Sequence, residues 1–340
     1  MLKNYFKVAL RSVFRQKMYA SINIFGLAIG ICCCLLIVSF VLDELSYDNF
    51  HPDGDSTYRI ALDRKFPDNG FQYARSPMPI GMTLYNELPE VTAATRLYNS
   101  FGSITIEKGD QYFDEQNVIA ADSNFFDFFG AKLLLGDIKT ALNEPNSLVV
   151  TTEMAQKYFG STDVIGKQLE MQNIGQMLIS GVVEPMPSNS HFHFDFLFSL
   201  KTIPNLYNNQ FWGSYVAYNY VKMEASVIPV VEEKIQEVLQ RHMEPQIQSI
   251  LGISWQQYEE AGNAHRYFFQ PLKGIHLNSN LQWELEPNGS ASTVYLFAGI
   301  SVFILLIACI NFINLATARS ANRAKEVGMR KVLGALKGQL

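Results

Sequence analysis

Two long runs without charged residues limit what this chain can fold into. Residues 18–42 form 25 consecutive positions without Asp, Glu, Lys or Arg, and residues 287–318 form 32. An α-helix needs roughly 20 apolar residues to cross the hydrocarbon core of a bilayer, which is about 30 Å thick. Both runs exceed that length, so the sequence predicts a membrane protein with transmembrane helices at residues 19–42 and 291–318 and excludes an ordinary soluble protein.

The distribution of charge predicts how the chain is oriented in the membrane. Residues 1–20 carry a net charge of +5 and residues 319–340 another +5, whereas the 298 residues between them carry -15. Lys and Arg next to membrane helices stay on the cytoplasmic side. We therefore expect a multi-pass protein of a bacterial inner membrane, with both termini cytoplasmic and residues 43–290 outside the cytoplasm.

The cysteines agree with this topology. All four lie in the two apolar runs, at Cys32, Cys33, Cys34 and Cys309. The outside domain then has no disulfide and must be held together by its own hydrophobic core. The first run is longer than the apolar stretch of a cleaved signal peptide and lacks a small-residue cleavage pattern, so we interpret it as an uncleaved anchor.

Both membrane-flanking regions carry further patterns. Residues 1–18 have an apolar stripe and a basic stripe at helical spacing, which predicts a cytoplasmic amphipathic helix in contact with membrane lipids. The first apolar run contains a Gly-x-x-x-Gly motif and the second contains two amides near its inner end, so we expect helix–helix packing at Gly26, Gly30, Asn311 and Asn314. Residues 319–340 are again basic and amphipathic.

The residues between the membrane helices predict an α+β domain. We expect helices at residues 78–88, 123–129, 152–159 and 226–242, the last with Pro229 in its first turn and a face of Val231, Ile235, Val238 and Leu239. Runs rich in β-branched and aromatic residues predict strands at residues 58–62, 102–106, 148–151, 177–183, 193–199 and 215–223.

The sequence offers few groups for chemistry. The stretch GSTDVIGKQ from Gly160 departs from a phosphate-binding loop in spacing and in having Gln168 where a Ser or Thr is required, so we assign no nucleotide site. In SHFHFDF, His191, His193 and Asp195 alternate, which on a strand would place all three on one face as part of a metal site. We favour the alternative interpretation, in which the phenylalanines point inward and the polar residues outward. The sequence shows no catalytic set, cofactor site, metal site or nucleic-acid partner.

Four stretches resemble one family. They are FKVALRSVFRQKMYASINIFGLAIGI at the start, ADSNFFDFFGAKLLLGD with LNEPNSLVVTTEMAQKYFGSTDVIGKQL, then SGVVEPMPSNSHFHFDFLFSL, and finally RAKEVGMRKVLGA. Together they resemble bacterial ABC-transporter permeases of the FtsX/MacB type. The fold implied by this resemblance is two transmembrane α-helices flanking an α+β MacB-like periplasmic core domain.

The resemblance also implies a function. Permeases of this type transmit ATP-driven motion of a separate cytoplasmic ATPase to an outside domain, in efflux or in periplasmic export and regulation, and are themselves not enzymes. The resemblance places residues 319–340 at the start of an FtsX-like permease domain and assigns ATPase coupling to Arg323, Lys325, Glu326, Gly328, Arg330, Lys331 and Gly334. It implies an ABC ATPase subunit, a second permease copy or paired permease, and a periplasmic adaptor or effector as partners. Because family members continue with further membrane helices, we expect the chain to be the N-terminal part of such a permease.

Two other classes of protein stay open from the sequence. A two-helix membrane sensor would place a ligand-binding domain outside and a signalling output inside. An anchored periplasmic enzyme would also fit the topology, although no catalytic set is readable. The transported or regulated molecule is not encoded in any motif that we recognise.

Overall fold

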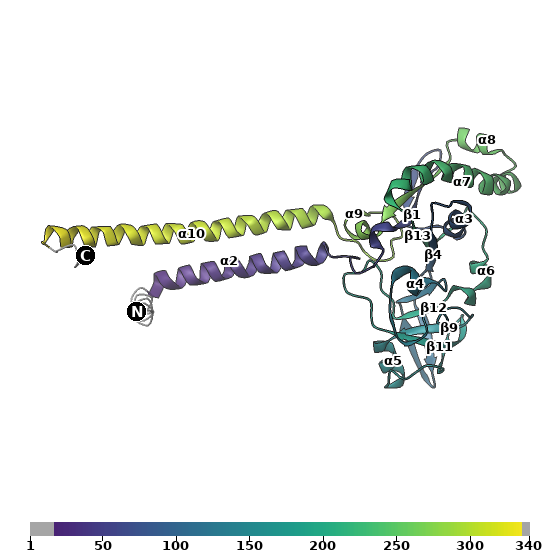
Figure 1. The fold of residues 1–340 in the computed structure, drawn as a ribbon, viewed down its shortest axis with the longest axis horizontal. Helices are drawn as coiled ribbons and strands as arrows, with labels where there is room; N and C mark the ends of the chain where they lie inside the picture. The colour runs from purple at the N-terminus through teal and green to yellow at the C-terminus, as the bar shows by residue number, and fades with distance from the viewer. Residues whose placement is uncertain (1–16, 335–340) are drawn as a thin grey trace. The chain divides into compact units, whose positions relative to one another are not determined.

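The structure is a computed structural model that describes residues 17–334, and the chain divides into two units (Figure 1). One unit contains two long helices, α2 (Lys17–Glu44) and α10 (Ala291–Val332). The other unit, residues 46–289, is a mixed α/β domain, which we call the large domain. The predicted fold class, two transmembrane α-helices flanking an α+β domain, is confirmed. The predicted helix at residues 1–18 lies almost entirely outside the described residues.

The two long helices form an antiparallel hairpin. Phe40 of α2 meets Phe297 of α10 edge to face, with ring centroids 5.4 Å apart. Further along, a Cβ atom built on Gly30 would lie 2.9 Å from the Cβ of Ala308. Residues 24–44 and 291–314 are long and apolar enough to cross a membrane, and only 6% and 11% of them are buried. Their exposed apolar side chains are what helices facing lipid require.

The second helix of the hairpin does not end where its apolar run ends. It continues without interruption through 42 residues, a length of about 63 Å at about 1.5 Å per residue. The basic segment after residue 318 therefore extends the same helix as far as Val332. One rod connects the start of the apolar run to most of the predicted coupling segment.

The large domain is built on one continuous sheet of 14 strands, in the order β14-β1-β13-β4-β7-β12-β9-β11-β10-β5-β6 with β2, β3 and β8 paired beside it. Most neighbours are antiparallel, but β9 with β11 and β7 with β12 are parallel. The strands are β1 (Thr57–Lys65), β2 (Gly70–Tyr73), β3 (Ser76–Pro77), β4 (Ala93–Tyr98), β5 (Ile104–Lys108), β6 (Gln111–Glu115), β7 (Val118–Ala121), β8 (Leu133–Gly136), β9 (Ser147–Thr151), β10 (Gln168–Met171), β11 (Gly175–Val183), β12 (Phe196–Ser199), β13 (Tyr215–Lys222) and β14 (Ala264–Pro271).

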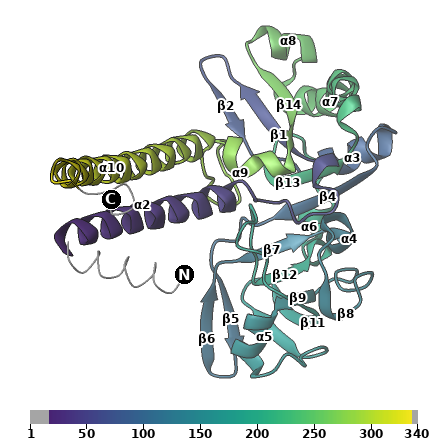
Figure 2. The same ribbon diagram turned by 60° about the vertical axis from the view of Figure 1, so that its left-hand side comes forward.

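Helices pack on several parts of this sheet, as Figure 2 shows. Near the β14 edge, α7 packs on β14 and α8, and α3 packs on β4 and β13; further along the sheet, α5 packs on the interior strands β9 and β11. The helices are α3 (Ile80–Glu87), α4 (Phe125–Phe129), α5 (Thr152–Phe159), α6 (Pro204–Tyr207), α7 (Ile228–Leu251), α8 (Trp255–Glu260) and α9 (Ile275–Asn278), with short 3₁₀ turns at Gly54–Ser56, Leu200–Thr202, Ala225–Val227 and Leu272–Gly274. Three buried clusters of apolar side chains form the core, one under each group of helices and one around α4.

Most predicted elements coincide with observed ones. The predicted face of α7 is buried, and Pro229 lies in its first turn. The helix runs on beyond the predicted end at residue 242 because Met243 and Ile247 continue the buried stripe, and it ends at Gly252 in the left-handed region. The strand predicted at residues 193–199 is wrong in its first half, since β12 begins only at Phe196.

Candidate functional site: the two connections to the membrane helices

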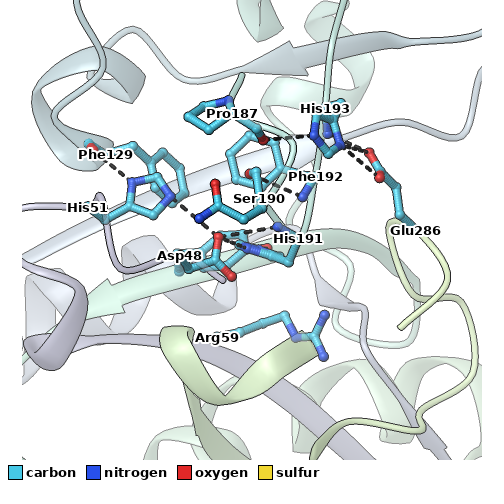
Figure 3. Close-up of polar contacts among 12 residues, drawn as sticks. Asp48, His51, Arg59, Phe129, Pro187, Ser190, His191, Phe192, His193 and Glu286 are labelled. Atoms are coloured by element: carbon cyan, nitrogen blue, oxygen red, sulfur yellow. Dashed lines mark hydrogen bonds and ion pairs between the residues drawn. The ribbon is translucent and has the colours of Figure 1, made fainter. Parts of the chain in front are cut away.

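Two short segments join the large domain to the membrane helices. We call residues 46–56, which follow α2, the N-strap, and residues 279–289, which precede α10, the C-strap. A third segment, residues 187–195, precedes β12 and contacts both straps, and we call it the histidine loop. The two straps are the covalent connections between the helices and the large domain, so their attachment to the domain is the candidate functional site (Figure 3).

The N-strap is tied to the histidine loop through its backbone and through a buried carboxylate. The backbone N–H of Asp48 donates to the carbonyl of Asn189 at 2.9 Å, and the Asn189 amide donates back to the Ser46 carbonyl at 3.1 Å. The Asp48 carboxylate is fully buried and accepts from the backbone N–H of His191 at 3.2 Å and from its ring Nδ1 at 2.8 Å. Asp48 has a φ of +58°, a left-handed conformation that Asp tolerates better than most residues.

A chain of buried polar groups continues from this carboxylate. The Nε2 atom of His191 lies 2.9 Å from the hydroxyl of Tyr220, which is itself fully buried, and burial raises the pKa of that phenol. On the other side, the Nδ1 atom of His51 donates to the carbonyl of Phe129 at 2.9 Å, which places its Nε2 3.6 Å from Asp48. Burial alone would raise the pKa of Asp48, but the charge and hydrogen bonds of His191, together with the nearby His51, lower it. Asp48 is therefore an anion at neutral pH.

The N-strap also packs closely against one glycine of the large domain, where a side chain would collide with the strap. Gly130, which caps α4 with a φ of +69°, faces the ring of Pro52, and a Cβ atom there would lie 2.6 Å from two ring carbons. Both the backbone angle and the lack of space exclude a side chain at this position. The strap therefore lies in direct contact with the end of α4.

The C-strap is held by a second buried ion pair. Arg59 of β1 is fully buried and donates five hydrogen bonds, two to Glu284, two to Gln270 and one to the Ser279 hydroxyl. The two bonds to Glu284 use both carboxylate oxygens, a fork-to-fork geometry that only an arginine can make. Because Arg59 is fully buried on β1, between β13 and β14, this pair fixes the C-strap to a buried position next to the β14 edge of the sheet.

An aromatic contact supports the same strap. Trp283 has a φ of +58° and stacks on Tyr73, with ring centroids 4.5 Å apart, and its carbonyl accepts from the Tyr218 hydroxyl at 2.8 Å. The backbone of Gln282 exchanges hydrogen bonds with Gln72 and Ala74. The strap thus follows the edge of the sheet next to β2 before it reaches α10.

A third ion pair joins the C-strap to the histidine loop. The carboxylate of Glu286 accepts from the His193 backbone N–H and from its ring Nδ1, the latter at 2.9 Å. The other ring nitrogen, Nε2, donates to the carbonyl of Pro187 at 3.0 Å. The hydrogen bond with Glu286 raises the pKa of His193 against the opposing effect of burial, whereas burial raises and the contact with His193 more strongly lowers the pKa of Glu286. The histidine loop is therefore fastened to both straps, through His191 on one side and His193 on the other.

His191, His193 and Asp195 of the SHFHFDF segment consequently do not form part of a metal site. His191 pairs with Asp48, His193 with Glu286, and Asp195 accepts from the amide of Asn117 at 3.0 Å. The favoured alternative, with the polar residues outward, is correct for the buried phenylalanines but wrong for His191, which is 3% exposed. The segment forms no strand at these positions because the backbone N–H groups of both histidines donate to side-chain carboxylates instead of to a neighbouring strand. Within residues 17–334, no cluster of His, Cys, Asp and Glu is arranged to hold a metal ion.

The structure also locates the other sequence-predicted residues. Gly26 faces the Asn311 amide, at 3.2 Å from a built Cβ, and Gly30 faces Ala308, whereas Asn314 is exposed. The proposed coupling residues Arg323, Lys325, Glu326, Gly328, Arg330 and Lys331 lie in the last part of α10, and Gly334 follows it with a φ of +89°. Their packing and coupling roles stay predictions. Sequence reasoning did not identify Asp48, Arg59, Glu284 or Glu286, because no local pattern indicates their distant partners.

The fold and the site define a class of protein: two long apolar helices flank a large α+β domain, and the straps that lead to these helices are held on the domain by ion pairs. The family described as the MacB-like periplasmic core domain matches residues 20–238. The chain belongs to this family, and the predicted resemblance to permeases of the FtsX/MacB type is confirmed.

The chain is also similar to individual proteins and solved structures. The macrolide export ATP-binding/permease protein MacB from Aggregatibacter actinomycetemcomitans is 22% identical over 340 residues, which is 97% of this chain and 48% of the relative. The chain thus spans about half the length of this curated relative. A solved domain of a protein assigned as a permease from Porphyromonas gingivalis is 22% identical, covers 65% of this chain and 91% of its own, and superimposes with a TM-score of 0.54, which shows the same fold. The solved periplasmic region of MacB from Actinobacillus actinomycetemcomitans is 18% identical, covers 65% of this chain and 92% of its own, and has a TM-score of 0.41.

Proposed function

We propose that this chain is a permease subunit, or the N-terminal part of one, of an ABC-type complex that relays motion from a cytoplasmic ATPase to the large domain outside the membrane. In this proposal both termini are cytoplasmic and the protein lies in a bacterial inner membrane. The basic residues that flank both apolar runs support that orientation. The chain itself is a non-catalytic subunit, and ATP is hydrolysed by its partner.

The observation that carries the proposal is the uninterrupted course of α10. A helix resists bending far more than a loop does, so a displacement at residues 323–331 is transmitted along the rod to its first residue, Ala291. The C-strap ends at residue 289, just before this helix, and its two ion pairs would pass the displacement to β1 and to the histidine loop. The helix α10, the C-strap and its ion pairs thus form one continuous route from the coupling segment into the sheet.

The proposed partners follow from the same arrangement. An ABC ATPase would bind the basic, amphipathic end of α10, a mode in which a helix lies in a protein groove. A second permease copy or a paired permease would pack against the membrane hairpin, and an adaptor or effector would bind the large domain outside. Efflux, export or regulation of a periplasmic process are all compatible with such a relay.

Co-purification tests the proposal directly. The full chain would be expressed with a tagged form of the ABC ATPase encoded beside it, extracted in mild detergent, and isolated through the tag. We expect the chain to co-purify, and we expect deletion of residues 319–340, Glu326→Ala or Arg330→Ala to abolish or strongly weaken co-purification. Lys17→Ala, a basic residue at the cytoplasmic end of the other membrane helix, is the matched control and should leave it unchanged.

Two results would count against this function. Equal recovery of the wild type and of the variant lacking residues 319–340 would show that the coupling segment does not contribute to the interface with the ATPase. No association of the full chain under any mild condition would favour the alternative, a two-helix membrane sensor with a ligand-binding domain outside.

A further inference from the structure

The ring of His193 makes two hydrogen bonds that a neutral imidazole cannot make together. Its Nε2 atom donates to the carbonyl of Pro187, because a carbonyl oxygen can only accept. Its Nδ1 atom faces the Glu286 carboxylate, which also accepts the His193 backbone N–H. Two acceptors on two ring nitrogens require two N–H groups, and only the imidazolium cation has both. The geometry therefore describes a charged histidine bound to a charged carboxylate.

The groups around this pair favour the same charge state. Glu286 reaches it from the C-strap and Asp48 from the N-strap, and both negative charges favour the His193 cation. His191, on the histidine loop itself, favours the Glu286 anion. Of the other titratable groups on and beside these segments, Arg59 pairs with Glu284, His51 lies 3.6 Å from Asp48, and Asp195 of the histidine loop accepts from the Asn117 amide.

We propose that His193 and Glu286 form a pH-sensitive clasp, which fastens the C-strap to the histidine loop while His193 carries its second ring proton and opens when rising pH removes that proton. When His193 loses its proton, one of its two acceptors loses its donor and the ion pair disappears. The clasp concerns the fold of the strap and does not depend on the proposed ATPase partner. It would make the attachment of the C-strap, which leads to α10, responsive to the pH outside the cytoplasm.

The sign of the pH dependence follows from the two pKa shifts. The His193 pKa is raised above 6.5, so its contribution to stability is fully present below pH 6.5 and is lost as pH rises through the raised pKa. The Glu286 pKa is lowered below 4.5, so its contribution is present above pH 4.5 and is lost as pH falls through the lowered pKa. The clasp is therefore most stable between these two values.

Deuterium exchange at the imidazole C2 position, measured by mass spectrometry on the full chain in detergent between pH 5 and 10, gives the pKa of each histidine. We expect His193 to titrate above pH 6.5 in the wild type and at a lower pH in Glu286→Gln, which keeps the shape of the side chain and removes its charge. Glu90→Gln is the matched control, because it removes an ion pair with Lys234 elsewhere in the domain and should not move the His193 pKa. His265, with a pKa lowered by burial to about 3, should show no titration over this range.

Amide exchange on the same samples tests whether the clasp holds the strap. As pH rises through the His193 pKa, peptides covering residues 187–195 and 280–289 should lose protection together in the wild type, relative to Glu286→Gln at the same pH. A half-exposed pair predicts a change of up to about fivefold in their exchange rate. A His193 pKa at or below 6.5, or identical strap protection in the wild type and Glu286→Gln at every pH, would overturn the proposal. If Glu286→Gln fails to fold, the wild-type His193 pKa and the coincidence of the two protection losses decide the question.

Discussion

Removing Arg59 should destabilise the large domain more than removing any surface charge. Arg59 is fully buried, and the Glu284 side chain that it neutralises is only 13% exposed. Arg59→Ala leaves that carboxylate without a counter-charge and deprives Gln270 and Ser279 of a donor. Breaking a buried ion pair by removing one partner costs about 3–5 kcal/mol.

This cost can be converted into a measurable shift. The slope of unfolding free energy against urea for a domain of this size is about 3 kcal/mol/M. Arg59→Ala should therefore lower the urea midpoint by about 1–2 M. All three tryptophans of the chain, Trp212, Trp255 and Trp283, lie in the large domain, so intrinsic fluorescence reports its unfolding in the full chain in detergent.

Three variants separate the ion pair from other effects. Arg59→Lys keeps the charge but loses the fork, so its loss of stability should lie between those of the wild type and Arg59→Ala. The double variant Arg59→Met with Glu284→Met leaves no charge unpaired, so it should be far more stable than the two single losses added together. Arg241→Ala removes a 62% exposed arginine that pairs with Glu87 and should cost less than about 1 kcal/mol. A shift below about 0.3 M for Arg59→Ala, or strict additivity in the double variant, would refute this reasoning.

Two glycines provide further tests with matched controls. Gly130→Ala should destabilise the domain by about 1–3 kcal/mol in the same urea assay, because it forces a Cβ atom against Pro52 at a positive φ. The control is Gly109→Ala, which has a similar φ but open space around its Cβ position in the described structure, and it should cost less. Equal losses of stability in the two variants would contradict the close contact between Gly130 and Pro52. Gly30→Leu should separate the membrane helices, whereas Gly299→Leu, whose Cβ position is open in the described structure, should not. Disulfide cross-linking of cysteines placed at positions 40 and 297 measures this separation, and undiminished cross-linking in Gly30→Leu would argue against packing at that glycine.

Local patterns in the sequence predicted the elements whose formation depends on neighbouring residues. The two apolar runs, the buried face of α7 and its proline at the first turn are all encoded within a few residues, and the structure shows them where the periodicity places them. The alternation around His191 and His193 was equally regular but misleading. Its backbone donors are taken by carboxylates 143 and 93 residues away, and no local spacing indicates such partners.

The candidate site could not be predicted from the sequence because its partners, too, are far apart along the chain. Arg59 and Glu284 are 225 residues apart, and each reads in the sequence as one charged residue among many. Both straps are short segments rich in turns, without a hydrophobic period, so their function as attachments becomes visible only when the sheet brings β1 and the histidine loop beside them. Topology, and not composition, creates this site.

The two straps differ in how they would respond to force. The N-strap depends on Asp48 and His191, which are fully or almost fully buried, whereas the C-strap has one buried pair at Glu284 and one half-exposed pair at Glu286. Glu286 is two residues nearer to α10 along the chain, so a pull on that helix reaches His193 and Glu286 before it reaches Arg59 and Glu284. The weaker, titratable contact therefore yields first and lengthens the connection, while the buried pair keeps the strap on the sheet. In the proposed relay, this order would let the C-strap lengthen by a limited amount while Arg59 and Glu284 keep it on the sheet, which is what a reversible relay requires.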